Sequence, residues 1–179
     1  DRSGGGGNYS PSDQALGATY TPSAVEILNG SLTLTLTTTN NGGCAQVTDQ
    51  MTITITDAPI VNAGSDADVC SNNANITLNG SVIIAAGGTW SDGNGTYSTD
   101  ENDLAAVYTP SLAELLAGSV TLTLSSTGNG NCLAVTDQVT YTFTDPPAVN
   151  AGTDGLVCEN NALISLNGSL VGANFGLWS

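Results

Sequence analysis

Hydrophobic and polar residues alternate strictly along several stretches of the chain. In residues 31–37 every second position is Leu and the positions between are Ser or Thr, and residues 51–56, 120–124 and 139–143 follow the same rule. A period of two places apolar side chains on one face of a strand and β-branched Thr on the other. The pattern therefore predicts antiparallel strands with one buried and one solvated face.

Turn-forming residues lie between the members of each predicted strand pair. Residues 40–43 read Asn-Asn-Gly-Gly and residues 128–131 read Gly-Asn-Gly-Asn, which is typical of hairpin connections. Shorter strands are expected at residues 76–78, 88–90 and 106–108. Two hairpins and several short strands are therefore predicted.

A helical signal interrupts the strands in two places. Ser23 with Glu26, and Ser111 with Glu114, have the spacing of a capping box, and a Gly follows each of them a few residues later. Each site predicts a single short helical turn that crosses between two strands.

The whole pattern repeats at an offset of 88 residues, without insertion or deletion. Tyr20 returns as Tyr108 and Cys44 as Cys132, and more than half of the paired positions are identical. A period of this length is a whole domain, because solenoid repeats are only about 20–50 residues long. We therefore interpret the chain as part of a tandem array, whose properties depend on length, stiffness and exposed faces.

Proline residues mark the module boundaries. Asp57-Ala58-Pro59 and Asp145-Pro146-Pro147 follow the last strand of each copy, and Pro stops strand pairing. We predict the C-terminal part of one module at 1–58, a complete module at 59–146 and the N-terminal part of a further module at 147–179. Short strands joined by tight turns within about 90 residues predict an all-β fold of tandem immunoglobulin-like β-sandwich modules.

Composition narrows the range of functions. The chain has 1 Lys or Arg against 16 Asp and Glu, for a formal net charge of −15, so its surface repels the phosphates of nucleic acids and anionic membranes. There is no His and no Lys, and Arg2 is the one basic residue, which removes His-based acid–base catalysis, Schiff-base chemistry and the usual zinc ligand sets. Aromatic residues are 5% of the chain, too few for a sugar-binding glycosidase cleft. We expect no enzymatic activity, no cofactor and no nucleic-acid partner.

Other features indicate an exported protein. No run of about 18 apolar residues is present, so membrane insertion is not expected. The chain opens at Asp1 rather than Met, which suggests a processed product or an excerpt. A surface rich in Thr, Ser, Asn and Gly, together with cysteines that recur with the repeat, indicates an extracellular or cell-surface location.

Several runs carry a family resemblance. They are Val61 to Asp66, Val69-Cys70, Ile76 to Ser81, Gly88 to Ser91, Tyr108 to Ser111 and Val135 to Thr140. Together these runs resemble the PKD-like, immunoglobulin-like repeats of very large surface adhesins, typical of gliding bacteria that use the type IX secretion system. The resemblance covers essentially the whole chain and implies a role in adhesion or fibre building. Arg2 departs from the pattern, because it stands where the other copies have Trp90 and Trp178.

Four cysteines, two per copy, allow three pairings. Within one module the pair is Cys70 and Cys132, and closing that loop would contribute roughly 4 kcal/mol. In an ordinary sandwich these two positions lie at opposite ends, about 20 Å apart, whereas a disulfide spans at most about 7 Å between Cα atoms. Either the first strand bends, or the bond joins modules or chains. By the same rule, Cys44 and Cys158 are expected to pair with a neighbouring module or chain.

Two further features could bind ligands, but a simpler structural interpretation is favoured for each. Asp92, Asp100 and Asp103 lie in an acidic loop that could hold Ca²⁺, although a solvated acidic turn is favoured. The Asn-X-Ser/Thr sequons and exposed Thr could carry glycans. Trp90 and Trp178 could stack on the sugars of surface glycans, although a Trp packed between two sheets is favoured.

We therefore expect an extracellular structural or adhesive repeat protein that forms a cell-surface fibre or filament. The alternative is a carbohydrate- or Ca²⁺-binding module on the same scaffold. The expected partner is the protein itself, as head-to-tail copies or as continuous tandem modules. Because 147–179 supplies the part that 1–58 lacks, complementation between chains and excision from a longer chain predict the same fibre.

Overall fold

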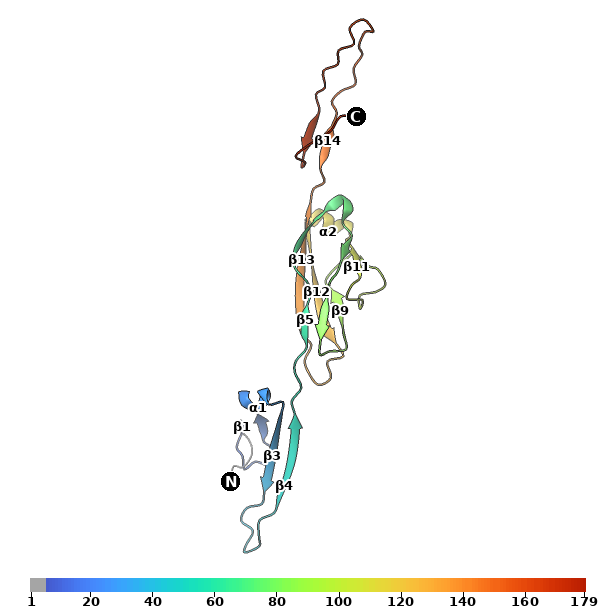
Figure 1. Ribbon diagram of the computed structural model, residues 1–179. Helices are drawn as coiled ribbons and strands as arrows, with labels where there is room; N and C mark the ends of the chain where they lie inside the picture. Colours follow the sequence, from blue (N-terminus) through green and yellow to red (C-terminus); the bar gives the residue numbers. More distant parts are fainter. Residues whose placement is uncertain (1–5) are drawn as a thin grey trace. The chain divides into compact units, whose positions relative to one another are not determined.

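The computed structural model describes residues 6–179, which form strands joined by turns and two short helices (Figure 1). The chain divides into two compact units, residues 1–58 and residues 59–179. Arg2 lies outside the described residues, so its departure from the Trp pattern has no structural counterpart to report.

Within the first unit, residues 6–58 contain one helix and four strands in two separate pairs. β1 pairs with β2 and β3 pairs with β4, both antiparallel. The bounds are β1 Asn8–Ser10, β2 Thr19–Thr21, α1 Ala24–Leu28, β3 Ser31–Thr37 and β4 Thr48–Thr54. The alternating runs at 31–37 and 51–56 are thus the hairpin that the sequence predicts.

The second unit contains the remaining elements. They are β5 Ile60–Asn62, β6 Ala67–Cys70, η1 Ser71–Asn73, β7 Ile76–Thr77, β8 Ser81–Ile83, β9 Gly87–Ser91, β10 Thr96–Tyr97, β11 Val107–Thr109, α2 Leu112–Ala117, β12 Ser119–Thr127, β13 Thr136–Thr144, β14 Ala148–Asn150 and β15 Ser169–Val171.

Residues 59–146 fold as an immunoglobulin-like β-sandwich. One layer has the strand order β6-β13-β12-β9, in which β6 runs parallel to β13 and the other pairs are antiparallel. The facing layer contains β10-β11-β7 and the pair β5-β8. Since β7 and β8 are successive parts of one run, this layer corresponds to the ABED sheet and the other to the CFG sheet of the immunoglobulin fold. The predicted all-β, immunoglobulin-like fold is confirmed.

The core of the sandwich lies between these two layers. Trp90, Tyr108 and Leu124 are buried at its centre, each exposing 2% or less of its surface. Other buried apolar residues are Ala63, Ile76, Leu78, Ala106, Val120, Leu122, Val139, Tyr141 and Phe143. The inward positions of β12 and β13 are therefore the apolar positions of the alternating pattern.

The two hairpins share one register across the 88-residue offset. Leu36 lies opposite Asp49 in β3–β4, and Leu124 lies opposite Asp137 in β12–β13. On the outer face, the hydrogen bond between Thr33 and Thr52 hydroxyls has its counterpart between those of Thr121 and Thr140. The local structure of the hairpin is thus the same in both units.

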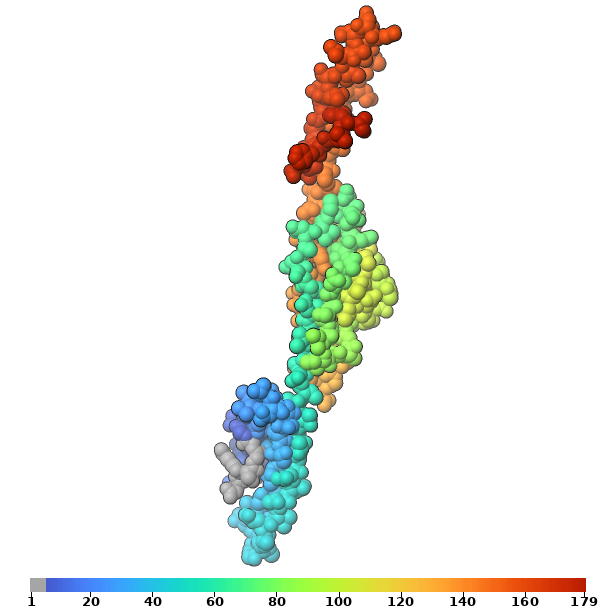
Figure 2. Space-filling view, viewed as in Figure 1, coloured from blue at the N-terminus to red at the C-terminus, as the bar shows by residue number. Residues whose placement is uncertain are grey.

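The inner faces of the two hairpins differ in burial. Leu36 is 62% exposed whereas Leu124 is fully buried, and Met51 is 58% exposed whereas Val139 is 1% exposed. In the second unit the facing layer, β10-β11-β7 with β5-β8, covers this face, and residues 6–58 contain counterparts of β10 and β11 alone, namely β1 and β2. The counterpart of β5–β8 is β14–β15, in residues 147–179, where every side chain is exposed (Figure 2).

We expect Leu124→Ala to lower the local stability of β12 and β13 by about 3 kcal/mol, because it leaves a cavity beside Trp90. Leu36→Ala is the matched control at the equivalent exposed position and should cost less than about 1 kcal/mol in β3 and β4. Native-state hydrogen exchange read by mass spectrometry on dilute protein measures both values. Equal losses at the two positions would contradict the difference in burial.

Candidate functional site

A carboxylate, a tyrosine hydroxyl and the start of a helix meet in the second unit. Glu114 Oε1 accepts hydrogen bonds from the Tyr108 hydroxyl at 2.6 Å and from the Asn94 N–H at 2.8 Å. Its Oε2 accepts from the Ser111 N–H at 2.7 Å and from the Ser111 hydroxyl at 2.8 Å. The Ser111–Glu114 capping box that the sequence predicts is confirmed and forms part of a larger cluster.

The first unit contains the same cluster. Glu26 accepts hydrogen bonds from the Tyr20 hydroxyl, the Gly6 N–H and both the N–H and the hydroxyl of Ser23. The predicted Ser23–Glu26 capping box is therefore confirmed as well. Each equivalent distance agrees with its counterpart within about 0.1 Å. The cluster therefore forms in residues 6–58 although these residues contain no counterpart of β5 to β9.

These hydrogen bonds shift the pKa values of the groups that make them. Burial by itself would raise the pKa of Glu114, but the hydrogen bonds from Tyr108, Asn94 and Ser111 outweigh it and lower the pKa. In the first unit, the Ser23 N–H and then the Tyr20 hydroxyl lower the pKa of Glu26 to about 2. Since each carboxylate accepts four hydrogen bonds, its lone pairs are occupied and it holds the helix start against the neighbouring strand.

Two of the three acidic residues considered for Ca²⁺ accept hydrogen bonds from the backbone of their own loop. Asp100 accepts a hydrogen bond from the Asn102 N–H at 2.7 Å, and Asp103 accepts one from the Ala105 N–H at 3.0 Å, so both close local turns. Asp92 lies between β9 and β10 with a positive φ of 71°. Within residues 6–179, no group of three or more Cys, Asp or Glu is arranged to hold a metal ion. The solvated acidic turn is the interpretation that these contacts favour.

Cys70 and Cys132 lie at opposite ends of the sandwich. Cys70 ends β6 and lies opposite Thr144, at the C-terminal end of β13. Cys132 lies in the loop before Thr136, where β13 begins. A strand of this length separates its ends by about 27 Å, far beyond the reach of a disulfide. Because β6 pairs in parallel with β13, this geometry favours the alternative that the distant Cys70 and Cys132 take part in bonds between modules or chains, and their pairing stays a prediction. Cys44 and Cys158 are both exposed, so their pairing with a neighbouring module or chain stays a prediction.

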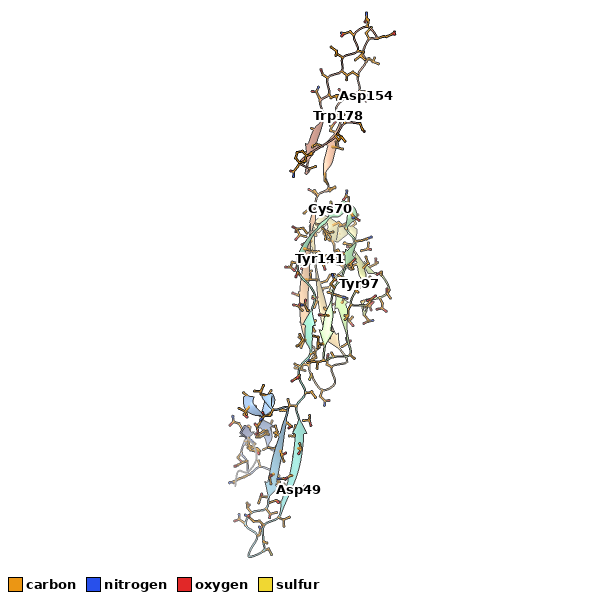
Figure 3. All side chains as sticks on the ribbon, viewed as in Figure 1. Asp49, Cys70, Tyr97, Tyr141, Asp154 and Trp178 are labelled. Atoms are coloured by element: carbon orange, nitrogen blue, oxygen red, sulfur yellow. The ribbon has the colours of Figure 1, made fainter. Side chains whose placement is uncertain are left out.

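The two tryptophans differ in exposure. Trp90 exposes 2% of its surface and packs, like Leu124, against Gly80, so it is a core residue rather than a sugar platform. Trp178 is 52% exposed and lies against Gly168 in the β14–β15 segment (Figure 3). The predicted core position is thus confirmed for Trp90. Trp178 is half-exposed, so the same position is not buried in residues 147–179.

The β3–β4 hairpin presents an uncovered apolar face, which we call the acceptor face. It contains Leu36, Met51 and the half-buried Leu34, Ile53 and Ile55. In the part of the chain that the structure describes, both outer edges of this two-stranded sheet lack a strand partner. Unpaired edges beside an apolar face are the usual sites at which another strand adds to a sheet.

Residues 147–179, which we call the donor segment, contain a groove. It has a volume of about 320 Å³, and its walls include Val149, Gly168, Leu170, Gly176 and Trp178. Sequence reasoning missed this groove. The available signal was the recurrence of Gly80, Gly88 and Trp90 at the 88-residue offset, as Gly168, Gly176 and Trp178.

Neither helix in residues 6–179 is long and apolar enough to cross a membrane, since α1 has five residues and α2 has six. No family model and no curated protein matches the sequence. The resemblance to PKD-like adhesin repeats therefore stays a prediction.

Solved structures show distant similarity to cadherin domains. Extracellular cadherin domains 1–4 of protocadherin gamma B7 align with 76% of this chain, at 16% identity and a TM-score of 0.37. The protocadherin gamma B4 extracellular domain aligns with 76% of the chain, at 16% identity and a TM-score of 0.35. The chain spans only 38% of the first structure and 25% of the second. At these values the similarity carries no argument about what the chain does.

The Tyr108–Glu114 cluster predicts how stability depends on pH. Because the folded state lowers the pKa of Glu114 below 4.5, its stabilisation is complete above that value and is lost as the pH falls through the folded pKa. We expect Glu114→Gln to cost about 2 kcal/mol at pH 7, since buried donors lose a charged acceptor, and to flatten the acid limb. Urea unfolding from pH 2 to pH 7 measures this. Glu101→Gln, on an exposed side chain, is the control, and an unchanged acid limb in Glu114→Gln would contradict the assignment.

Proposed function

We propose that this protein is an extracellular structural or adhesive protein, in which immunoglobulin-like modules joined in series form a stalk or fibre. It acts through its length and its surfaces, and catalysis is not part of its role. The resemblance to surface adhesins supports a location at the cell surface and export by a type IX system. The partner is the protein itself, in further copies or in continuous modules.

The observation that carries this proposal is the path of the chain through the complete module. The chain enters at β5, where the Ala63 N–H donates a hydrogen bond to Asp137 near the start of β13. It leaves at Thr144, the last residue of β13. The two ends are therefore about 27 Å apart, along the length of the strand. Modules joined in this way extend a chain rather than fold it back.

Short connections support the same function. Residues 55–59 separate β4 from β5, and residues 145–147 separate β13 from β14. Both connections contain Pro, which stiffens a linker and does not continue a strand. Short, Pro-containing connections limit the freedom of one module relative to the next, as a stalk requires.

The surface suits a fibre that stays separate from its neighbours. The net charge of −15 is spread over modules whose outer strand faces are lined with Thr. Like charges repel along the whole length of two parallel fibres, so this surface keeps fibres apart and soluble. No contact in the described residues favours the alternative of a dedicated glycan or Ca²⁺ site.

Negative-stain electron microscopy of the native material, with small-angle scattering of the purified chain, tests the proposal. We expect filaments with an axial repeat of roughly 40 Å per module, which is the length of β13 plus a three-residue connection. A covalent dimer of the 179-residue chain should double the longest dimension in scattering. Compact particles whose longest dimension does not grow with the number of modules would contradict a stalk.

A further inference from the structure

We propose that Asn129 and its counterpart Asn41 are sites of spontaneous covalent modification, at which the side-chain amide is lost as ammonia and aspartate or isoaspartate takes its place. Each residue precedes a Gly in the loop of a hairpin, Asn129 between β12 and β13 and Asn41 between β3 and β4. The reaction needs water and no enzyme. It adds one negative charge to each loop, and it is expected whether or not the modules form a fibre.

The reaction begins at the backbone nitrogen of the residue that follows Asn. The Gly130 nitrogen attacks Cγ of Asn129, the new C–N bond closes a five-membered imide ring, and the Cγ–Nδ2 bond breaks. The proton of the Gly130 N–H leaves with Nδ2 as ammonia. Water then opens the ring at one of its two carbonyl groups, which gives aspartate or isoaspartate. The attack requires an N–H that is free of hydrogen bonds and a backbone that can approach the side chain, and Gly permits this approach because it has no Cβ.

The chain contains several Asn-Gly pairs, so sequence by itself does not single out the two hairpin loops. The pairs begin at Asn29, Asn41, Asn79, Asn94, Asn129 and Asn167. Asn167 offers no comparison, because its counterpart Asn79 is followed by a Gly that bonds to Leu104, and the residue corresponding to Leu104 lies beyond residue 179. The remaining pairs differ in the hydrogen bond of the Gly N–H and in the space around the Gly.

At three pairs the Gly N–H is held by a hydrogen bond. The bonds run from Gly30 to the Ile27 carbonyl at 3.1 Å, from Gly80 to the Leu104 carbonyl at 3.0 Å and from Gly95 to the Tyr108 hydroxyl at 2.8 Å. Gly80 and Gly95 are also enclosed, since a Cβ atom at either would lie 2.7 Å from an aromatic ring. The nitrogen can attack only after such a bond opens, so the rate is reduced to the small fraction of molecules that are locally open.

At the two hairpin loops the Gly N–H donates no hydrogen bond within residues 6–179. Gly42 and Gly130 have positive φ values of 60° and 59°, and both are exposed. A Cβ atom at either position would meet nothing within 4 Å. The attacking nitrogen is therefore free, and the loop has room to bring it towards the Asn side chain.

The Asn129 side chain is in an unfavourable environment before it reacts. Its Oδ1 is buried and accepts no hydrogen bond from residues 6–179, whereas its Nδ2 donates to the Ser126 carbonyl at 3.2 Å. A buried oxygen without a partner lowers stability, so the side chain gains this energy back when it leaves the position. Conversion removes the Nδ2 donor and brings a carboxylate near the Ser126 carbonyl, so we expect the modified loop to be less ordered.

Peptide mapping of the 179-residue chain after incubation in heavy-oxygen water at mildly alkaline pH tests the proposal. Each conversion incorporates heavy oxygen from the water, and fragmentation by electron transfer distinguishes isoaspartate from aspartate. We expect Asn41 and Asn129 to convert faster than the protected Asn-Gly pairs by a factor of about ten or more, because local opening must precede reaction at those pairs. In urea all pairs should convert at similar rates, which would show that the fold and not the local sequence causes the difference.

A matched pair of variants addresses the two requirements separately. Asn129→Gln lengthens the side chain by one methylene, so a larger ring must close, and conversion in this loop should be lost while Asn41 is unaffected. Tyr108→Phe removes the hydroxyl that accepts from the Gly95 N–H, so conversion at Asn94 should rise severalfold.

Asn79 is the internal control in every sample, because its Gly N–H bonds to the backbone of the same module. Its continued protection in Tyr108→Phe shows that the module is folded. Similar rates at Asn129 and Asn79 in the native chain would overturn the proposal. An unmodified Asn129 after a time in which the chain in urea has converted would overturn it as well.

Discussion

An alternating strand must have its apolar face covered, and every other feature of this chain depends on that requirement. In the complete module, the facing layer of β10-β11-β7 and β5-β8 covers the inner face of β12–β13, and Leu124 is fully buried. In the first unit the same hairpin keeps its register, yet Leu36 is 62% exposed. Strand pairing is therefore local to each hairpin, whereas the coverage that stabilises a sandwich comes from residues far away in the sequence.

The polar cluster explains how an uncovered half-module keeps its form. Glu26 and Glu114 make equivalent hydrogen bonds to a tyrosine hydroxyl and to a helix start, and no partner of either carboxylate in these bonds comes from β5 to β8. All partners of Glu26 lie within 20 residues of it along the chain. Each cluster thus holds its local geometry by hydrogen bonds between residues that are close together in the sequence.

Local patterns determine which parts of this structure can be predicted from sequence. Alternation at 31–37 and 139–143 gives the strands and their buried face, and Ser with Glu three residues later gives both helix starts. The Cys70–Cys132 pair and the groove beside Trp178 depend on which strand lies next to which. Parallel pairing of β6 with β13 carries Cys70 to the far end of the module, and no short pattern encodes that pairing. Comparing the two copies position by position recovers much of this information, because one copy shows the contacts of the other.

The geometry of the sandwich bears on the fibre that we propose. Because β5 enters and β13 leaves at opposite ends of the sandwich, each module added in series would move the chain forward. Side-by-side contact between two such fibres would bring like charges together along their whole length, since the chain carries a formal net charge of −15. The covalent order of the modules, rather than lateral association, would therefore set the direction of the proposed fibre.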